Sequence, residues 1–298
     1  MKATFSDAGP VTGCEPITCT RALGDVPLAN RPLVDLQREQ LVKAGFELSE
    51  TGTPRNLFVR NDAWLSAAML TGLRQADAPV VVRDASGVAL AWIGDPSQTT
   101  KTLASDKESF LIRHPWDLLA IHEQVMATIQ DGRIEGDVSP MATVEGILIL
   151  GKGSRLLPGV YVEGTVIIGA HCKIGPNCYI RGATSIGDGC HIGQAVEIKN
   201  SIIMERTSIG HLSYCGDSII GSHVNFGAGT ITANFRHDGK THRSMAEGQL
   251  LDTGRRKFGT IMGDHVHTGI HTSLYPGRKL WPNTSTLPGA IVKTDLHA

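Results

Sequence analysis

The sequence predicts a mainly β protein in which a parallel β-helix follows a small α/β domain. The first observation is a period of six, because aliphatic or equivalent residues recur at every sixth place from Leu150 to Ile198. The second is that, after two five-residue steps, the count runs through Phe226 and then from Met262 to Val292. In a hexapeptide repeat each unit is one short strand plus a turn, and stacking buries a continuous core. We therefore expect a triangular prism of short parallel strands.

The cysteines agree with this interpretation. The fifth place of each hexad takes a small inward side chain, and Cys172, Cys178 and Cys190 all stand there. None of the six cysteines forms a C-x-x-C pair, and the spacing between Cys172 and Cys178 equals the repeat period. Cysteine then serves as a small hydrophobic residue. We expect core packing here rather than a disulfide framework or a zinc knuckle.

The residues before the repeat predict a different architecture. Residues 27–46 are typical of a turn followed by an amphipathic helix, and residues 80–94 of two strands around an Asp-Ala-Ser-Gly turn. Residues 115–132 form a second helical pattern, with Pro at its start and Gly at its end. The expected domains are a small α/β domain over 1–113, a linking helix within 114–139, and a β-helix over 140–298 with an inserted loop at 235–256.

Composition narrows the class of protein. A chain of 298 residues that is 41% hydrophobic has room for a sizeable core and two domains. The net charge of -1 offers no basic excess for a nucleic-acid partner. The first residues lack an apolar signal region, and no run of 18 apolar residues occurs. We therefore expect a cytoplasmic protein without a membrane partner.

Residues 27–46 resemble the PLANKPLI-type element of sugar-1-phosphate nucleotidyltransferases. Those enzymes open with a glycine-rich G-x-G-T-R loop whose backbone amides cradle the nucleotide phosphates. No such loop occurs between Met1 and Leu23. The first domain therefore resembles a truncated sugar-1-phosphate nucleotidyltransferase, and we expect no pyrophosphate-forming activity from it.

The resemblance is closer in the repeat. The motifs G-H-L-S-Y-x-G-D and N-F-G-A-G-T-I-T-A-N, followed by RRKFGTIMGD at 255–264, resemble the acetyltransferase domain of bifunctional N-acetylglucosamine-1-phosphate uridyltransferase/glucosamine-1-phosphate acetyltransferase. They also resemble the related sugar-1-phosphate nucleotidylyltransferase/acetyltransferases. The resemblance implies a left-handed β-helix that forms a homotrimer. It also implies acetyl-coenzyme A as co-substrate, no required metal, and glucosamine or galactosamine 1-phosphate as acceptor, in UDP-N-acetylglucosamine biosynthesis.

The same motifs imply roles for single residues. His211 matches the general base, and Glu197 the residue that orients it. The sequence departs from the family at Ile270, where a coenzyme-binding Ser stands, and at Pro288, where Ala stands. The implied acceptor-binding residues are Arg181, Lys199, Tyr214, Asn225 and Lys257, and the implied acyl-donor contacts are Ala228 and Asn234.

The repeat register supports part of this site independently. Arg181 and Lys199 are both second in their hexads and three hexads apart, so a coil of three hexads stacks them about 4.8 Å apart. Two cations at that spacing favour an anion between or beside them. By the same count Tyr179, Glu197 and Tyr214 form a neighbouring column. His211 takes an outward place, and an imidazole suits the removal of a proton from an attacking amine.

Three other readings stay open. The first is a zinc-dependent, gamma-type carbonic anhydrase-like hydratase, in which several of the histidines named below would bind the metal, because zinc accepts three imidazoles. The protein would otherwise be a nucleotidyltransferase relative with a degenerate catalytic domain, or a non-catalytic trimeric scaffold, since fold does not dictate function. The histidines concerned are His237, His242, His265, His267 and His271.

Overall fold

The computed structural model describes residues 1–9, 13–53, 56–99 and 101–297. The predicted first domain therefore includes three short stretches, 10–12, 54–55 and 100, that lie outside the described residues. Contacts divide the chain into two compact units. Unit 1 consists of Met1–Thr12, Ala22–Val26 and Arg31–Arg113, and unit 2 of Gly13–Arg21, Pro27–Asn30 and His114–Ala298.

Unit 1 is built on a mixed six-stranded sheet, in the order β4-β1-β5-β8-β7-β9. β1 is parallel to both its neighbours, whereas β8 is antiparallel to β5 and β7. The sheet strands are β1 (Lys2–Ser6), β4 (Glu47–Leu48), β5 (Leu57–Arg60), β7 (Val80–Arg83), β8 (Ala89–Ile93) and β9 (Thr102–Ala104). The shorter elements are η2 (Leu23–Asp25), β3 (Arg31–Pro32), β6 (Ala63–Trp64) and β10 (Phe110–Leu111).

Two helices pack against this sheet. α1 (Leu33–Lys43) and α2 (Ala67–Arg74) place Leu41 and Leu73 in the same buried cluster as Val59 of β5. α1 confirms the helix expected within residues 27–46, and β7 and β8 confirm the two strands around an Asp-Ala-Ser-Gly turn. Unit 1 is therefore the small α/β unit that the sequence predicts.

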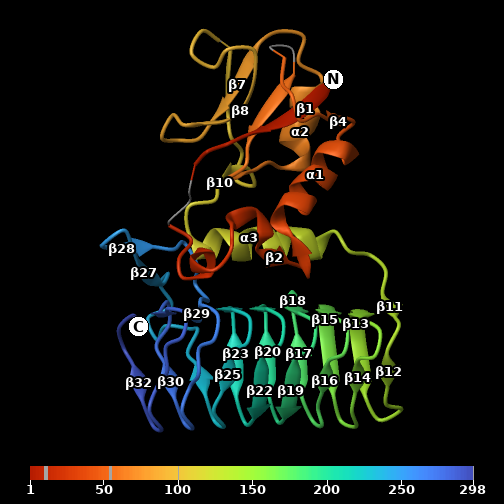
Figure 1. Ribbon diagram of the computed structural model, residues 1–298, viewed down its shortest axis with the longest axis vertical. Helices are drawn as coiled ribbons and strands as arrows, with labels where there is room; N and C mark the ends of the chain where they lie inside the picture. The colour runs from red at the N-terminus through yellow and green to blue at the C-terminus, as the bar shows by residue number, and fades with distance from the viewer. Residues whose placement is uncertain (10–12, 54–55, 100, 298) are drawn as a thin grey trace. The chain divides into compact units, whose positions relative to one another are not determined.

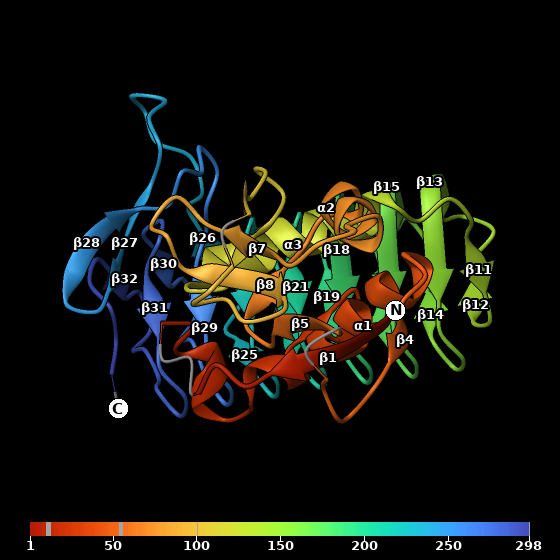
Figure 2. The same cartoon turned by 90° about the horizontal axis from the view of Figure 1, so that it is seen from above.

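Unit 2 is a parallel β-helix with three faces, and Figures 1 and 2 show its coils side by side from β11 to β32. The first face contains β11 (Arg133–Ile134), the ends of β13 (Thr143–Leu150) and β15 (Tyr161–Ile168), then β18 (Thr184–Ile186), β21 (Ile202–Ile203), β24 (Ile219–Ile220), β29 (Ile261–Met262) and β31 (Lys279–Leu280). The second contains β12 (Asp137–Val138), β14 (Arg155–Leu156), β16 (Lys173–Ile174), β19 (His191–Gln194), β22 (Ser208–His211) and β25 (Asn225–Phe226). The third contains the starts of β13 and β15, then β17 (Tyr179–Arg181), β20 (Glu197–Lys199), β23 (Tyr214–Gly216), β26 (Ile231–Thr232), β30 (Ser273–Leu274) and β32 (Ile291–Val292).

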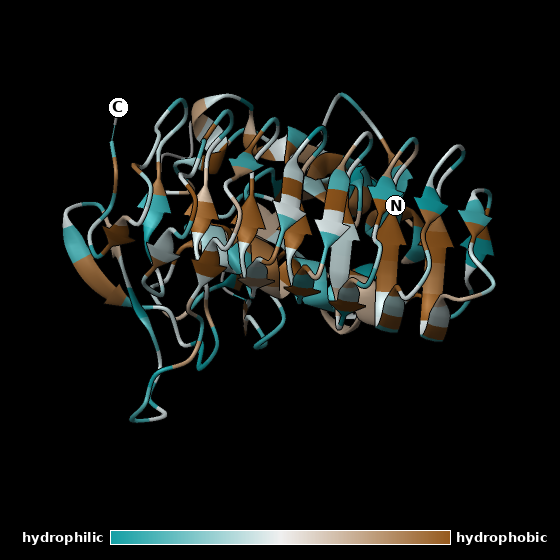
Figure 3. Ribbon diagram, turned by 90° about the horizontal axis from the view of Figure 1, so that it is seen from below, coloured by the Kyte–Doolittle hydropathy of each residue, from teal (hydrophilic) through white to brown (hydrophobic). Residues whose placement is uncertain are grey.

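The six-residue count is confirmed by the strand register. Ile168 pairs with Ile186, which pairs with Ile203 seventeen places on, so the five-residue steps lie where the sequence places them. The inward residues form one continuous buried cluster that includes Cys172, Cys178 and Cys190. In Figure 3 brown segments accordingly recur from strand to strand. Alternation along each strand sends one set of side chains inward and leaves the other available for a site.

The linking helix is α3 (Pro115–Ala127). It ends at Ala127 rather than at the Gly132 that the sequence favours. The Thr128 backbone N–H and hydroxyl both donate to the carbonyl of Val125, and such local bonding by Thr competes with continued helix.

α3 lies along the first face of the β-helix, as Figure 1 shows. Its buried Met126 packs in one cluster with Ile167 and with Ala29, which follows β2 (Pro27–Leu28). His122 of α3 accepts a hydrogen bond from the Ala29 backbone N–H at 3.2 Å, and its other ring nitrogen lies 3.2 Å from the carbonyl oxygen of Ala183. The first face is therefore covered by the chain's own helix. The remaining short helix of unit 2 is η1 (Ile17–Cys19).

Candidate functional site

The third face carries the two polar columns that the repeat register predicts. Tyr179 pairs with Glu197, and Glu197 pairs with Tyr214. Arg181 pairs with Lys199 in the same register. These residues come from three adjacent strands, β17, β20 and β23, so one patch of sheet brings them together. The strand register therefore confirms that Arg181 and Lys199 lie side by side on adjacent strands.

Each of these cations has a carboxylate within the chain. Arg181 donates to Glu197 through Nε at 2.8 Å and approaches it with a second guanidinium nitrogen at 2.7 Å. Lys199 Nζ lies 3.1 and 3.2 Å from the two carboxylate oxygens of Asp217. The Arg181 and Glu197 side chains are each 33% exposed, whereas Lys199 is only 8% exposed. Arg181 can therefore reach an anionic ligand from the surface, while Lys199 faces mainly into the protein.

Tyr214 and Asn234 form the next part of the site. The Asn234 side-chain nitrogen donates to the Tyr214 hydroxyl at 2.8 Å and to Asp217 at 2.6 Å. Burial, together with the negative charges of Asp217 and Glu197, raises the pKa of Tyr214 to about 12. The phenol is therefore protonated at neutral pH and is available as a hydrogen-bond donor.

His211 lies at the second corner, the turn from the second face to the third. It ends β22, it is exposed, and Leu212 after it has a φ of 49°. This left-handed conformation turns the chain sharply at the corner. Gln194 is its register partner in the preceding coil. Within the described residues the imidazole makes no hydrogen bond, so its ring nitrogens are accessible to a ligand.

The next coils place the predicted acyl-donor residues along the same corner. The Gly229 backbone N–H donates to the His211 carbonyl, which puts Ala228 in the following coil beside His211. Ile270 occupies the corner one coil further and is 50% exposed. Asn225 is exposed on β25 of the second face. His211 and these residues thus lie on the second corner and face, apart from the cation pairs of the third face.

The inserted loop leaves the stack between β26 and β29 and carries the hairpin of β27 (Arg243–Ala246) and β28 (Gln249–Asp252). Figure 2 shows it projecting beside the C-terminal coils. Arg255 contacts Glu123 of α3 at 2.5 Å, so its charge is used within the chain. Lys257 is exposed and bridges to Phe235 through the backbone, next to Asn234. Of the loop's basic end, Lys257 remains open to a ligand.

The histidines considered for zinc lie in different places. His265 stacks on His223 with 4.8 Å between ring centroids, His267 pairs with Asn225 on the second face, and His271 follows Ile270 at the second corner. Among the described residues no group of three or more His, Cys, Asp or Glu could hold a metal ion.

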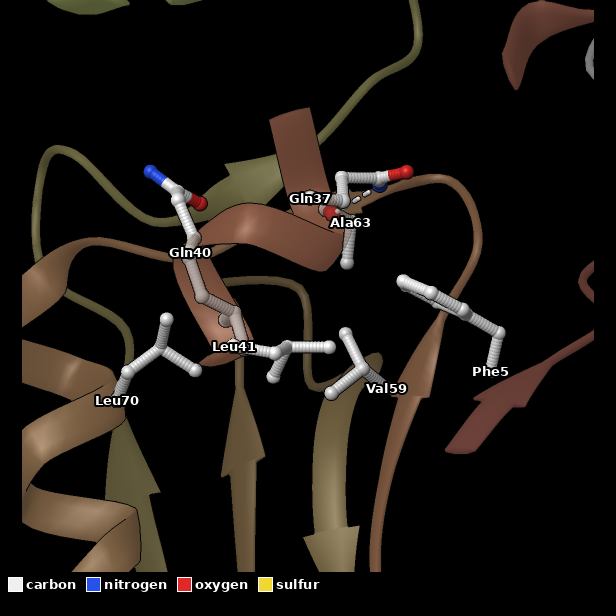
Figure 4. A pocket seen from close by; sticks show the side chains of 8 residues that line it. Phe5, Gln37, Gln40, Leu41, Val59, Ala63 and Leu70 are labelled. Carbon is white, nitrogen blue, oxygen red and sulfur yellow. Dashed lines mark hydrogen bonds between the residues drawn. The ribbon is translucent and has the colours of Figure 1, made fainter. Parts of the chain in front are cut away.

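Unit 1 contains a small cavity, shown in Figure 4, between α1, α2 and the sheet. Its volume is about 10 Å³, which is room for a single water molecule. The Gln37 side-chain nitrogen donates to Ala63 at 2.8 Å, while Gln37 Oε1 has no hydrogen-bond partner among the described residues. A nucleotide does not fit in this cavity. No helix in the described part of the chain is long and apolar enough to cross a membrane.

Three residues that join the site together were not assigned to it from the sequence. Asp217 stands inside the G-H-L-S-Y-x-G-D motif, yet only the structure shows that it contacts both Lys199 and Asn234. His242 contacts the Asn234 carbonyl oxygen at 3.0 Å from within the inserted loop. Gly216 leaves the space that Tyr214 and Asn234 occupy. The motif is a signal for Asp217, whereas His242 was considered from the sequence only as a zinc ligand and not as a contact of Asn234.

Comparison with known proteins shows what the repeat region is similar to. Residues 162–276 match the model of a family described as the GMPPB C-terminal domain. A 185-residue stretch is 38% identical to the bifunctional sugar-1-phosphate nucleotidylyltransferase/acetyltransferase of Sulfurisphaera tokodaii, covering 62% of this chain and 46% of that protein. A 189-residue stretch is 49% identical to the bifunctional protein GlmU of Methanococcus maripaludis, covering 62% of this chain and 45% of that protein. The hexapeptide-repeat region is related to the acetyltransferase domain of GlmU.

The match lies in the C-terminal 62% of the chain, the part that contains the β-helix. The chain spans less than half the length of these two relatives. Among solved structures, a UDP-N-acetylglucosamine acyltransferase from Francisella novicida aligns over 56% of this chain and 62% of its own, with 14% identity and a TM-score of 0.34. That likeness is too weak to bear on function.

Proposed function

We propose that this chain is an acetyl-coenzyme A-dependent N-acetyltransferase that acts on an amino-sugar 1-phosphate. The observation that carries the proposal is the exposed His211 at the second corner, close in sequence to Tyr214 and in the region related to named acetyltransferases. The third face adds a guanidinium, a carboxylate and a protonated phenol from Arg181, Glu197 and Tyr214. Such a mixed polar patch suits an acceptor with phosphate, hydroxyl and amine groups.

The chemistry of the proposed reaction assigns one proton transfer to His211. The acceptor nitrogen attacks the thioester carbonyl carbon, so a carbon–nitrogen bond forms and the carbon–sulfur bond breaks. The nitrogen loses a proton to the neutral imidazole, and the departing coenzyme A thiolate takes up a proton. An exposed imidazole without a competing partner in the described chain is suited to this role. Holding the amine near the acyl carbon supplies the rest of the rate enhancement.

The other residues would hold the two reactants. Arg181 and Lys257 are the cations that a sugar phosphate can reach, because both side chains have exposed surface. Tyr214 would donate to an oxygen of the acceptor, and Asn225 would contact it from the second face. Glu197 is ion-paired with Arg181 in the free chain. To orient the base, the Glu197 carboxylate would have to contact His211 and the Arg181 guanidinium at the same time. The acyl donor would lie along Ala228 and Asn234.

Assembly into a homotrimer is part of the proposal. Apolar side chains along the corner that carries His211 are strongly exposed: Leu212 by 63%, Ile270 by 50% and Leu287 by 80%. Exposed apolar patches of this kind mark interaction sites. A second copy of the chain is the occupant we propose, since a corner of one prism offers only part of a site and cyclic symmetry would complete it.

The test is release of free thiol from acetyl-coenzyme A across a panel of amino sugars and their 1-phosphates. We expect turnover with glucosamine or galactosamine 1-phosphate and much less with the unphosphorylated sugars. The same protein, given UTP, dTTP or GTP and a sugar 1-phosphate, should release no pyrophosphate. Absence of thiol release with every acceptor would overturn the proposal, and pyrophosphate release would overturn our interpretation of unit 1.

A further inference from the structure

The side-chain amide of Asn234 is held in one orientation. Its nitrogen donates to Asp217 Oδ2 at 2.6 Å and to the Tyr214 hydroxyl at 2.8 Å. An amide oxygen cannot replace that nitrogen, because the Asp217 carboxylate, ion-paired with Lys199, accepts hydrogen bonds and does not donate them. Both N–H groups of Asn234 are therefore used within the chain, and its carbonyl oxygen Oδ1 makes no hydrogen bond within the described residues.

Asp217 is well placed to impose this orientation. It is 2% exposed and paired with the nearly buried Lys199. Its backbone is also fixed, because its N–H donates to the Lys199 carbonyl at 2.8 Å and its own carbonyl accepts from Gly259 at 2.8 Å. A second amide, that of Asn200, donates to Oδ1 at 3.3 Å. The carboxylate is thus a rigid acceptor at the centre of the network.

The other end of Asn234 is anchored as well. Its backbone carbonyl accepts from the Phe258 N–H at 3.0 Å and lies 3.0 Å from a ring nitrogen of the buried His242. Gly216 leaves space for the pair: a Cβ atom there would lie 2.3 Å from the Tyr214 hydroxyl and 2.7 Å from the Asn234 nitrogen. Real Cβ atoms do not approach other atoms that closely, so an alanine would displace both side chains.

We infer that Asp217 is a positioning residue that sets the polarity of the ligand-facing surface. With Asp217 in place, Asn234 presents a hydrogen-bond acceptor, and the Tyr214 hydroxyl, already accepting from Asn234, presents its proton. The surface therefore accepts an N–H or O–H group at Asn234 and donates to an oxygen at Tyr214. If the proposed function holds, on which this interpretation of the ligands rests, the group at Asn234 belongs to the acyl donor and the oxygen at Tyr214 belongs to the amino-sugar phosphate.

The first experiment needs no substrate. Protein labelled with ¹⁵N-asparagine is followed by NMR, and the side-chain amide of Asn234 is assigned by its loss in Asn234→Asp. We expect its protons to exchange with solvent at least about tenfold more slowly than those of an exposed asparagine amide, since each is hydrogen-bonded. Asp217→Asn should abolish this protection, whereas Asp238→Asn, in the exposed inserted loop, should keep it. Unchanged protection in Asp217→Asn would overturn the inference.

Kinetics form the second readout. In Asp217→Asn the KM for the amino-sugar 1-phosphate should rise about ten- to hundredfold with kcat changed much less, because the oriented groups contact the ligand before and during reaction. A fall in kcat at constant KM would contradict the ligand-positioning role. Should the wild type transfer no acetyl group, the proposed function fails while the NMR result still decides the role of Asp217.

A second variant covers the case in which Asp217→Asn does not fold because Lys199 loses its partner. Gly216→Ala keeps the Asp217–Lys199 pair and displaces Tyr214 and Asn234 instead. It should show the same loss of amide protection and the same rise in KM. Retention of both wild-type values in a folded Gly216→Ala protein would overturn the inference.

Discussion

At the residue scale, the site combines groups that the repeat places in columns with partners that the repeat does not specify. The sequence predicts the stacking of Arg181 on Lys199, because side-chain direction recurs with every coil. It does not predict that Glu197 and Asp217 neutralise these cations, because pairing depends on rotamers and on the path of the chain at the corner. The expected free anion-binding pair is consequently two ion pairs of unequal exposure.

Substitution of the proposed base is the sharpest test at this scale. His211→Ala should lower kcat by about 10²- to 10⁴-fold, the usual contribution of a general base, and should leave folding unchanged because the side chain is exposed. Steady-state kinetics at saturating acceptor measure this. The matched control is His171→Ala, an exposed corner histidine with a φ of 57° in an earlier coil, which should keep wild-type activity.

A different result would move His211 to another role. If His211→Ala keeps more than about a tenth of the wild-type kcat, the loss is smaller than general-base catalysis implies. His211 would then be a binding or structural residue. Glu197 and Tyr214 would become the next candidates for proton transfer, since they are register partners on adjacent strands and both carry ionisable groups.

At the element scale, α3 is held on the β-helix by a small number of specific contacts. Trp116 near its start lies edge-on to Phe258 with 6.0 Å between ring centroids. Glu123 in its middle contacts Arg255 of the inserted loop. His122, fully buried, joins the backbone at Ala29 to that at Ala183. The helix pattern in the sequence predicts α3, but these partners are too distant along the chain for the pattern to name them.

Burial makes His122 a source of pH-dependent stability. It lowers the pKa of His122 from its ordinary value of 6.5 to about 4. In the unfolded chain the imidazole takes up a proton as pH falls below 6.5, while the folded protein resists this until about pH 4. Stability is therefore complete above pH 6.5 and is lost as pH falls from 6.5 to 4. The loss amounts to up to about 3 kcal/mol.

The measurement is the free energy of unfolding of the full chain in urea at several pH values. His122→Gln should be less stable than wild type at pH 7 and should show a shallower decline between pH 6.5 and 4. His223→Gln, at an exposed corner position, should keep the wild-type slope. An equally steep decline in His122→Gln would assign the pH dependence to other groups.

At the scale of the whole molecule, the proposed trimer accounts for exposed apolar surface that a single β-helix leaves uncovered. Leu287, 80% exposed on the second corner, is the most exposed large hydrophobic residue of the described chain. Covering it in a second copy would remove its apolar area from water. Light scattering should therefore report three times the mass of one chain.

A pair of charge substitutions tests where the copies meet. Leu287→Glu should weaken the trimer and lower activity with it, because a carboxylate is costly to bury in an apolar contact. Leu250→Glu, in the projecting hairpin and 48% exposed, should leave the mass unchanged. A wild-type monomer with full activity would show that no second copy is needed.

The six-residue repeat is enough to specify the β-helix, its register and the outward columns of the third face. A period of six repeats the direction of each side chain in every coil, so local order is enough to place Tyr179, Glu197 and Tyr214 side by side. The repeat does not specify which charges pair, how the inserted loop returns to Asn234, or where α3 is held, because these depend on the folded chain. These contacts join residues as far apart as Glu123 and Arg255, 132 places along the chain. Their formation depends on packing in space, which no local pattern encodes.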